Sequence, residues 1–197
     1  MSTLATTNIK HPSAANPAII LDSDGKATVA GMGLVHINTT TFSAVSSVSL
    51  NNVFTSDYDN YRIFFTATAS TTANAAMRLR VGGVDASNGT YGQAGYYAYI
   101  NAAVSGFSSN GGVGLTSWPQ TAPLSTLSES GFIMDIQNPA RSVSTFGVHH
   151  TNGVDAQYLY APRGVRHTTA TAYDGFSLIS SSGNMSGTVR VYGYKNS

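Results

Sequence analysis

The sequence predicts an all-β protein, a jelly-roll-like antiparallel β-sandwich preceded by an extended N-terminal arm. Short segments alternate apolar and polar residues with a period of two, which is typical of half-buried strands. Clusters of Gly, Asn, Asp, Pro and Ser separate these segments, as turns between strands require. No window has helical spacing, and the helix formers Glu and Lys are nearly absent.

The first 35 residues differ from the rest of the chain. This segment contains two prolines, Pro12 and Pro17, and an Asp24-Gly25 turn signal, but little periodicity. A proline restricts the residue before it to extended geometry. Because a chain of this composition buries little surface alone, we expect residues 1–35 to form an arm that orders against a partner. A disordered tail or a first hairpin of the domain is the alternative.

Residues 36–197 are expected to form the sandwich. The clearest strand is 76–81, which places Met77, Leu79 and Val81 on one face and Arg78 and Arg80 on the other. The expected strands are 42–50, 60–68, 76–81, 95–101, 131–137, 143–150, 156–161, 173–180 and 186–194. Strands at this spacing favour a sandwich, with a jelly roll as the leading form.

Two connections between these strands lead to specific predictions. Residues 101–130 are long and weakly patterned and contain Pro119 and Pro123, which makes them a candidate functional loop. Residues 181–184 read as a hairpin turn between the last two strands.

Composition excludes several classes of function. Only 10% of the residues are charged, against about 25% in an ordinary soluble domain, and the net charge is +1. The ten cations are scattered, so we expect no nucleic-acid partner. No apolar stretch approaches the roughly 18 residues of a membrane span. The chain has no cysteine, which excludes disulfides, thiol catalysis and cysteine-bound metals.

The carboxylates do not form a catalytic pattern. Glycoside cleavage usually needs two carboxylates held across the bond, and Glu129 is the only glutamate. Asp57 and Asp59 lie in a turn-like SDYDNY segment, where capping of the turn explains both. Asp22 and Asp24 resemble the start of a calcium loop, but its closing glutamate is missing. We therefore expect no catalytic residues and no cofactor.

The histidines are the remaining candidates for metal ligands. His149 and His150 are adjacent, so on a strand they point to opposite faces. One of them could bind a metal beside His167 or Asp155, but one half-buried and one exposed histidine is the simpler interpretation. No metal site is expected.

Aromatic residues give the strongest binding signal. Tyr91, Tyr96, Tyr97 and Trp118 lie among Gly, Ser and Asn, and tyrosine or tryptophan with small polar neighbours makes good contact surfaces. These four residues are the candidate contacts for a receptor or glycan. The alternative is that the tyrosines pack within the sheet or in a subunit interface.

Several segments resemble fibre-like structural proteins of marine and cyanobacterial tailed bacteriophages. NIKHPSAANPAIILDSDGKATVAGMGLV (8–35) is similar to their leader, and FTSDYDNYRIFF (54–65) with MRLRVGG (77–83) to their central part. YDGFSLISSSGNMSGTVRVYGYKN (173–196) is similar to their last two strands. The resemblance is loose over 84–172, and it rests on structural rather than catalytic motifs.

The resemblance implies a virion structural protein that is made in the host cytoplasm and is not an enzyme. Its arm would dock on other virion proteins, and its domain would be a tail-fibre or head-fibre module for host attachment. A homo-oligomer is expected, with a trimer favoured as a family tendency. The alternative functions are a capsid decoration protein and, less favoured, a glycan depolymerase. The candidate docking residues of the arm are Ile9, Lys10, His11, Pro12, Ile19 and Ile20.

Overall fold

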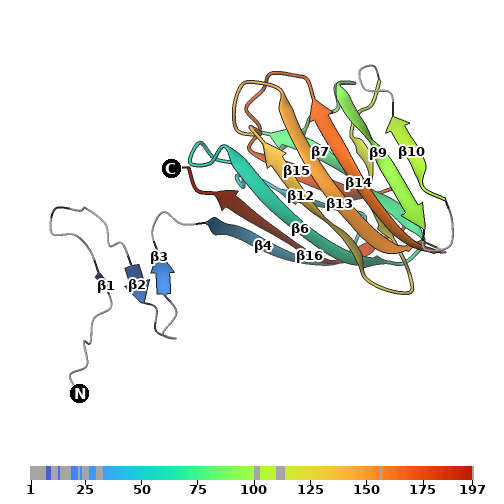
Figure 1. Ribbon diagram of the computed structural model, residues 1–197, viewed down its shortest axis with the longest axis horizontal. Coiled ribbons are helices and arrows are strands. Elements are labelled where there is room, and N and C mark those ends of the chain that lie inside the picture. The colour runs from blue at the N-terminus through green and yellow to red at the C-terminus, as the bar shows by residue number, and fades with distance from the viewer. Residues whose placement is uncertain are drawn as a thin grey trace.

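A computed structural model gives the fold of the chain. It describes residues 8–9, 13, 19–21, 23, 27–29, 33–99, 103–109, 114–155 and 157–196. Strands account for all the regular structure in these ranges, and every pairing between them is antiparallel. The prediction of an all-β antiparallel sandwich is therefore confirmed (Figure 1).

Two sheets form the sandwich. The larger one consists, in spatial order, of β10 (Ser105–Ser109), β9 (Tyr91–Tyr99), β14 (Gln157–His167), β13 (Thr145–Asp155), β12 (Ser130–Gln137), β6 (Asn60–Ala69), β16 (Met185–Tyr194) and β4 (Leu34–Val45). The smaller one has the order β11 (Trp118–Leu124), β7 (Ala73–Val81), β15 (Gly175–Ser180) and β5 (Ser47–Leu50), and the short β8 (Val84–Asp85) pairs with β7.

The strand orders of the two sheets match. Each strand of the smaller sheet is joined through a short connection to the strand of the larger sheet at the corresponding position: β5 to β4, β15 to β16, β7 to β6 and β11 to β12. Backbone hydrogen bonds continue between these connections, from Ser180 N to Ser46 O (2.9 Å) and from Ala69 N to Ser125 O (2.9 Å). Four arches therefore close one end of the sandwich.

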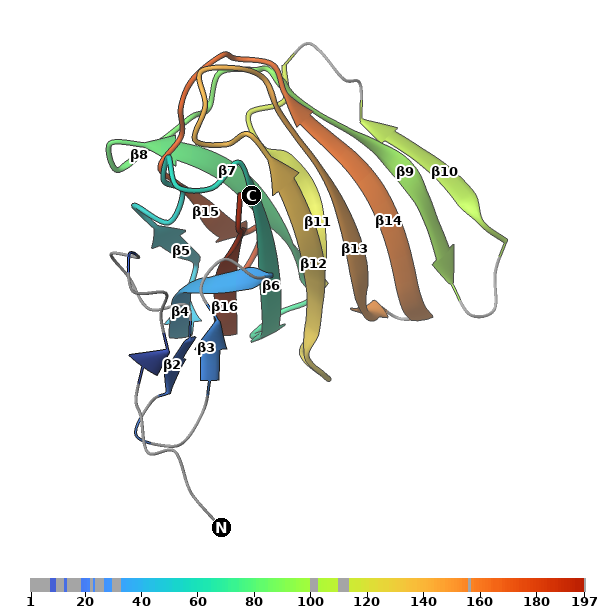
Figure 2. The same cartoon turned by 60° about the vertical axis from the view of Figure 1, so that its left-hand side comes forward.

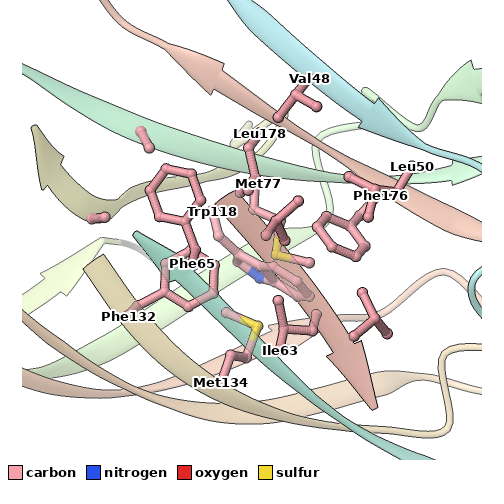
Figure 3. Packing of buried hydrophobic residues seen from close by; sticks show 14 of the residues in the cluster. Val48, Leu50, Ile63, Phe65, Met77, Trp118, Phe132, Met134, Phe176 and Leu178 are labelled. Atoms are coloured by element: carbon pink, nitrogen blue, oxygen red, sulfur yellow. The ribbon is translucent and has the colours of Figure 1, made fainter. Parts of the chain in front are cut away.

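Period-two burial explains why these segments pair as they do. In β6 and β7 the buried positions alternate with partly exposed ones along nearly the whole strand. Their inward side chains, among them Ile63, Phe65 and Met77, meet between the sheets (Figure 3). Burial of such side chains supplies most of the free energy that holds two sheets together.

The larger sheet continues past the smaller one and curves (Figure 2). Beyond β12 it adds β13, β14, β9 and β10, and the inner face of this extension packs against β11. Trp118 of β11 is fully buried and donates a hydrogen bond from Nε1 to Arg166 O of β14 (2.8 Å). The opposite, outer face of the extension carries the candidate site.

The structure corrects two predictions about connections. Residues 101–130 are not one long loop, because they include β10 and the buried strand β11. The two prolines in β11 obscured its strand pattern. Residues 181–184 do not close a hairpin, because β15 belongs to the smaller sheet and β16 to the larger one. A tight turn and a sheet-crossing arch carry the same residue types, so the sequence did not distinguish them.

The described part of the arm contains β1 (Asn8–Ile9), β2 (Ile19–Leu21) and β3 (Ala27–Val29), which form a small sheet in the order β1-β2-β3. The sandwich begins slightly earlier than the predicted residue 36, since Leu34 already pairs with Tyr194 and Val35 with Gly193.

Candidate functional site on the outer face of the larger sheet

The outer face of the larger sheet exposes several large apolar side chains close together. They come from four neighbouring strands, β12, β13, β14 and β9. Their exposed fractions are Ile133 42%, Phe146 47%, Val148 52%, Tyr160 47% and Tyr96 48%. A contiguous apolar patch of this kind marks an interaction site more often than isolated exposed residues do.

Strand alternation positions this patch. In β13, Phe146, Val148 and His150 face outward, whereas Gly147, His149 and Thr151 face the core. The pairing of β13 with β12 places His150 beside Ile133, and its pairing with β14 places Val148 beside Gly164. The patch is therefore a product of register between strands distant in the sequence.

A groove runs across the patch. It has a volume of about 520 Å³, and its apolar lining comes from Phe146 and Val148 of β13 and Ala94 of β9. Gly164, which pairs with Ala94, adds no side chain, so the floor stays low between the two strands. Polar side chains also line the groove; they belong to Ser108, Gln137 and Arg166. Its mixed lining suits a ligand that has both apolar surfaces and polar groups.

Tyr96, His150 and Tyr160 lie beside this groove. A second hollow of about 350 Å³ shares Val148 and Gly164 with the groove and is also lined by Tyr96 and His150. The His150 ring stacks on Tyr160, with the ring centroids 6.1 Å apart, and its Nδ1 is 2.9 Å from the Tyr160 hydroxyl. The pairing fixes the orientation of two exposed rings, which lowers the entropy cost of a contact through them.

A polar network lies farther along the same face. Arg62 of β6 donates two hydrogen bonds to the Asp135 carboxylate of β12, at 2.8 and 2.6 Å, and the Tyr194 hydroxyl donates a third at 2.6 Å. Partial burial alone would raise the pKa of Asp135, but these donors outweigh burial and hold the pKa below its ordinary value. The Asp135 carboxylate is therefore ionised and already hydrogen-bonded to Arg62 and Tyr194, as expected of an ion pair with a structural role.

Two of the four predicted aromatic contacts lie in the core. Tyr91 and Trp118 have no exposed surface and pack edge to face, with ring centroids 5.3 Å apart. Tyr91 donates a hydrogen bond to Ala86 O (2.8 Å), and burial raises its pKa. The prediction that these two residues contact a receptor was wrong. Small polar neighbours in the sequence are equally consistent with turns that flank buried aromatic residues.

The other two predicted contacts lie on opposite faces of β9. Tyr96 faces outward beside the groove, as the prediction requires. Tyr97 is half-buried on the inner face and packs against Tyr99, with ring centroids 5.5 Å apart. The sequence did not reveal Phe146, Val148 and Tyr160. The alternation of inward and outward residues along these strands can be seen in the sequence. Alternation does not show which face of a strand is left uncovered by other elements.

Of the predicted docking residues of the arm, three have described side chains. Ile9 and Ile20 are exposed at 47% and 44%, and Ile19 is partly buried. Lys10, His11 and Pro12 lie outside the described residues. The aspartates of the calcium-loop-like segment, Asp22 and Asp24, do as well.

The histidine pair separates as the alternation predicts. His149 is fully buried and His150 is exposed. Nδ1 of His149 is 3.1 Å from Oγ1 of Thr151. Burial, with Arg163 and His150 nearby, lowers the pKa of His149 to about 3. In the described ranges, no three or more His, Cys, Asp or Glu side chains are grouped so that they could hold a metal ion.

The aspartates of the SDYDNY turn have other partners than a substrate. Asp57 accepts a hydrogen bond from the Thr55 hydroxyl (3.1 Å), and Asp59 forms an ion pair with Arg141 (2.5 Å). In the part of the chain that the structure describes, no helix combines the length and apolar character needed to cross a membrane.

Comparisons with known proteins were made at the level of family, sequence and structure. No protein-family model, no curated protein and no solved structure matches this chain.

Proposed function

We propose that this chain is a structural protein of a bacteriophage virion, a fibre-type module that contacts the host surface through the outer face of its larger sheet. The observation that carries the proposal is the exposed groove of about 520 Å³ beside Tyr96, His150 and Tyr160. Exposed aromatic rings next to polar side chains are well suited to sugar rings, which have one apolar and one polar aspect. The resemblance of the leader and the last strands to phage fibre-like proteins supports the same function.

The composition is consistent with this role. A surface of neutral polar residues, with 10% charged residues overall, suits a protein held permanently in an assembly. The arm supplies exposed apolar side chains, Ile9, Ile20 and Leu21, for docking on other virion proteins. We expect a homo-oligomer, with a trimer favoured, and light scattering of the purified protein measures its mass.

Adsorption of the parent phage tests the proposal. Purified protein at saturation should compete with the phage for host cells. Tyr96→Ala should reduce the competition at least several-fold, because it removes an exposed ring beside the groove. Tyr97→Ala is the matched control, since Tyr97 is the next residue but faces the other side of the sheet. Absence of competition by the unmodified protein would reject the receptor role.

A capsid decoration protein is the second candidate. The feature that favours it is the arm, whose exposed isoleucines could clamp neighbouring capsid subunits. The number of copies per virion separates the two functions, because hundreds of copies indicate decoration and a few dozen or fewer indicate a fibre. Depolymerase activity, which is less favoured, would appear as new reducing ends when host polysaccharide is incubated with the protein.

A further inference from the structure

The strand orders of the two sheets end in four edge strands, and three of these are poor templates for a further strand. Strands β10 and β5 contain only five and four residues. Strand β11 contains Pro119 and Pro123, and its pairing with β7 is irregular. Short edges, prolines and irregular pairing are the features by which proteins prevent the addition of another strand.

Strand β4 is the exception among the four edges. It has 12 residues, Leu34–Val45, and contains no Asp, Glu, Lys, Arg or Pro. It lies at the end of the larger sheet, and among the described strands β16 is its one neighbour there (Figure 1). The arm strands β1, β2 and β3 pair with one another and form a separate sheet. A long edge strand without charge or proline is a template for pairing with another chain.

The flat part of β4 lies in the middle of the strand. The register of its pairing with β16 shifts once near each end of β4, and bulges of this kind twist an edge away from a partner. Between the two shifts, residues 38–42 pair one to one with residues 187–191 of β16. This section includes three consecutive threonines, Thr39, Thr40 and Thr41, and threonine favours strands. Residues 38–42 are therefore the section of the edge that is best suited to accept a strand.

This section is complementary to itself. In an antiparallel pair of two copies related by a two-fold axis, Thr40 lies opposite the partner's Thr40, and Thr39 lies opposite the partner's Thr41. Asn38 then lies opposite the partner's Phe42. Thr39 and Thr41 are both exposed in the single chain. Each would meet a threonine on the same face, and such cross-strand pairs stabilise a sheet.

The charges nearest to this section do not oppose the pairing. Arg190 of β16 is the residue that pairs with Thr39 within one chain. Three strand spacings of about 4.8 Å would separate the Arg190 positions of the two copies, so these side chains originate roughly 14 Å apart or more. The Debye length is about 8 Å at physiological ionic strength, so their repulsion is largely screened.

We propose that β4 is a dimerisation edge. Two copies of the chain pair through residues 38–42 in antiparallel orientation across a two-fold axis, and their larger sheets become one continuous sheet. The contact is isologous, so it joins copies in pairs and differs from the trimer that the resemblance favours. The groove lies on β13, β14 and β9, away from this edge. Both grooves of the pair therefore stay accessible, which raises the avidity for a ligand that is repeated on a surface.

The mass of the full chain in solution tests the proposal. Analytical ultracentrifugation over a wide concentration range should show a dimer of the unmodified protein. Thr39→Lys combined with Thr41→Lys places like charges opposite each other twice in the pair and should weaken the dimer about tenfold. Thr66→Lys combined with Asn152→Lys is the matched control, because it adds two lysines at exposed positions of the interior strands β6 and β13. The control should dimerise as the unmodified protein does.

A charge exchange separates direct pairing of the two β4 strands from an indirect effect of the substitutions. Thr39→Glu combined with Thr41→Glu should also weaken the dimer. A mixture of the lysine and the glutamate variants should associate again, because opposite charges then face each other across the two-fold axis. An effect on the fold of the single chain would not be reversed by mixing. Melting temperatures of all variants check that they are folded.

Three results would overturn the dimerisation edge. They are a monomer of the unmodified protein at every concentration, an oligomer whose mass both charged variants leave unchanged, and folded charged variants that fail to associate when mixed. If the unmodified protein is a monomer and the lysine variant is absent from virions, the edge belongs to a strand of another virion protein. Competition with the phage for host cells decides the proposed host contact independently of each of these results.

Discussion

Gly187 and Gly164 lie in strands of the same sheet but differ in what surrounds them. A Cβ on Gly187 of β16 would collide with the backbone of β6 at Thr66 and Ala67, whereas a Cβ on Gly164 of β14 would lie 3.9 Å from Ala94 O, an ordinary van der Waals distance. Gly187→Ala should therefore lower the free energy of unfolding by about 1–3 kcal/mol, because the strand pair must separate to admit the methyl group.

Urea denaturation measures this difference directly. Gly164→Ala, the matched control, should change stability by less than about 0.5 kcal/mol. Equal effects of the two variants would contradict the close approach of β16 and β6.

His149 and His167 make the stability of the protein sensitive to acid. Both are fully buried, and burial is the first cause that lowers the pKa of His149 to about 3 and that of His167 to about 4. The ordinary pKa is about 6.5, so below pH 6.5 the unfolded chain takes up protons that the folded chain does not. The free energy of unfolding should then fall by roughly 1.4 kcal/mol per pH unit for each histidine, down to the pKa of the folded state.

The pH dependence of the urea midpoint between pH 6.5 and 4.5 tests this expectation. Replacement of both residues by glutamine should make the dependence in this window markedly shallower. If the double variant and the unmodified protein lose stability in parallel, the two histidines are not the source of the acid sensitivity.

At the scale of elements, β11 depends on hydrogen bonds from side chains of the larger sheet. Its pairing with β7 is irregular between Trp118 and Ala122, and Gln120 has a positive φ of 55°. The larger sheet compensates, because Thr151 donates a hydrogen bond to Thr121 O (2.7 Å) and Gln93 donates one to Pro119 O (2.6 Å). Polar side chains thus satisfy carbonyl groups that a regular ladder would have paired.

Thr151→Val tests this role of the inner face. Valine preserves the shape of the threonine side chain but leaves the buried Thr121 O without its hydrogen-bond donor. The free energy of unfolding should therefore fall by about 1–3 kcal/mol. Amide hydrogen exchange should accelerate first in β11, because this strand has few regular backbone hydrogen bonds to its neighbour. Exchange that accelerates in β6 and β16 but not in β11 would refute the assignment.

At the scale of the whole molecule, the arm and the sandwich are expected to be separable. Strand β4 begins at Leu34, which pairs with Tyr194, so a truncation must end before residue 33. Deletion of residues 1–32 should leave the melting temperature within a few degrees of the full chain and should abolish incorporation into virions. The first part is measured by circular dichroism and the second by analysis of purified particles. A truncated protein that still enters particles would contradict the docking role of the arm.

Much of the fold could be predicted from local patterns. Strand β7 is predicted from its own sequence, which alternates the inward Met77 and Leu79 with the outward Arg78 and Arg80. No knowledge of its partner strands is needed, because a period of two arises from the alternation of side chains between the two faces of a strand. Strand β11 could not be found in this way, since it contains two prolines and takes part of its hydrogen bonding from side chains of other strands. Of the candidate contacts, Tyr96 is exposed and Trp118 is buried, although both stand among small polar residues.

The sequence by itself determined that the chain forms antiparallel strands, which residues share a face of each strand, and that cysteine chemistry is excluded. These properties follow from local geometry and composition. The tertiary structure decided which face of each strand is covered, because cover depends on register and on the length of the opposing sheet. Phe146, Val148 and Tyr96 remain exposed because they lie on the outer face of the larger sheet, whereas Trp118 of β11 is buried against the inner face. The groove beside Tyr96 exists for that reason.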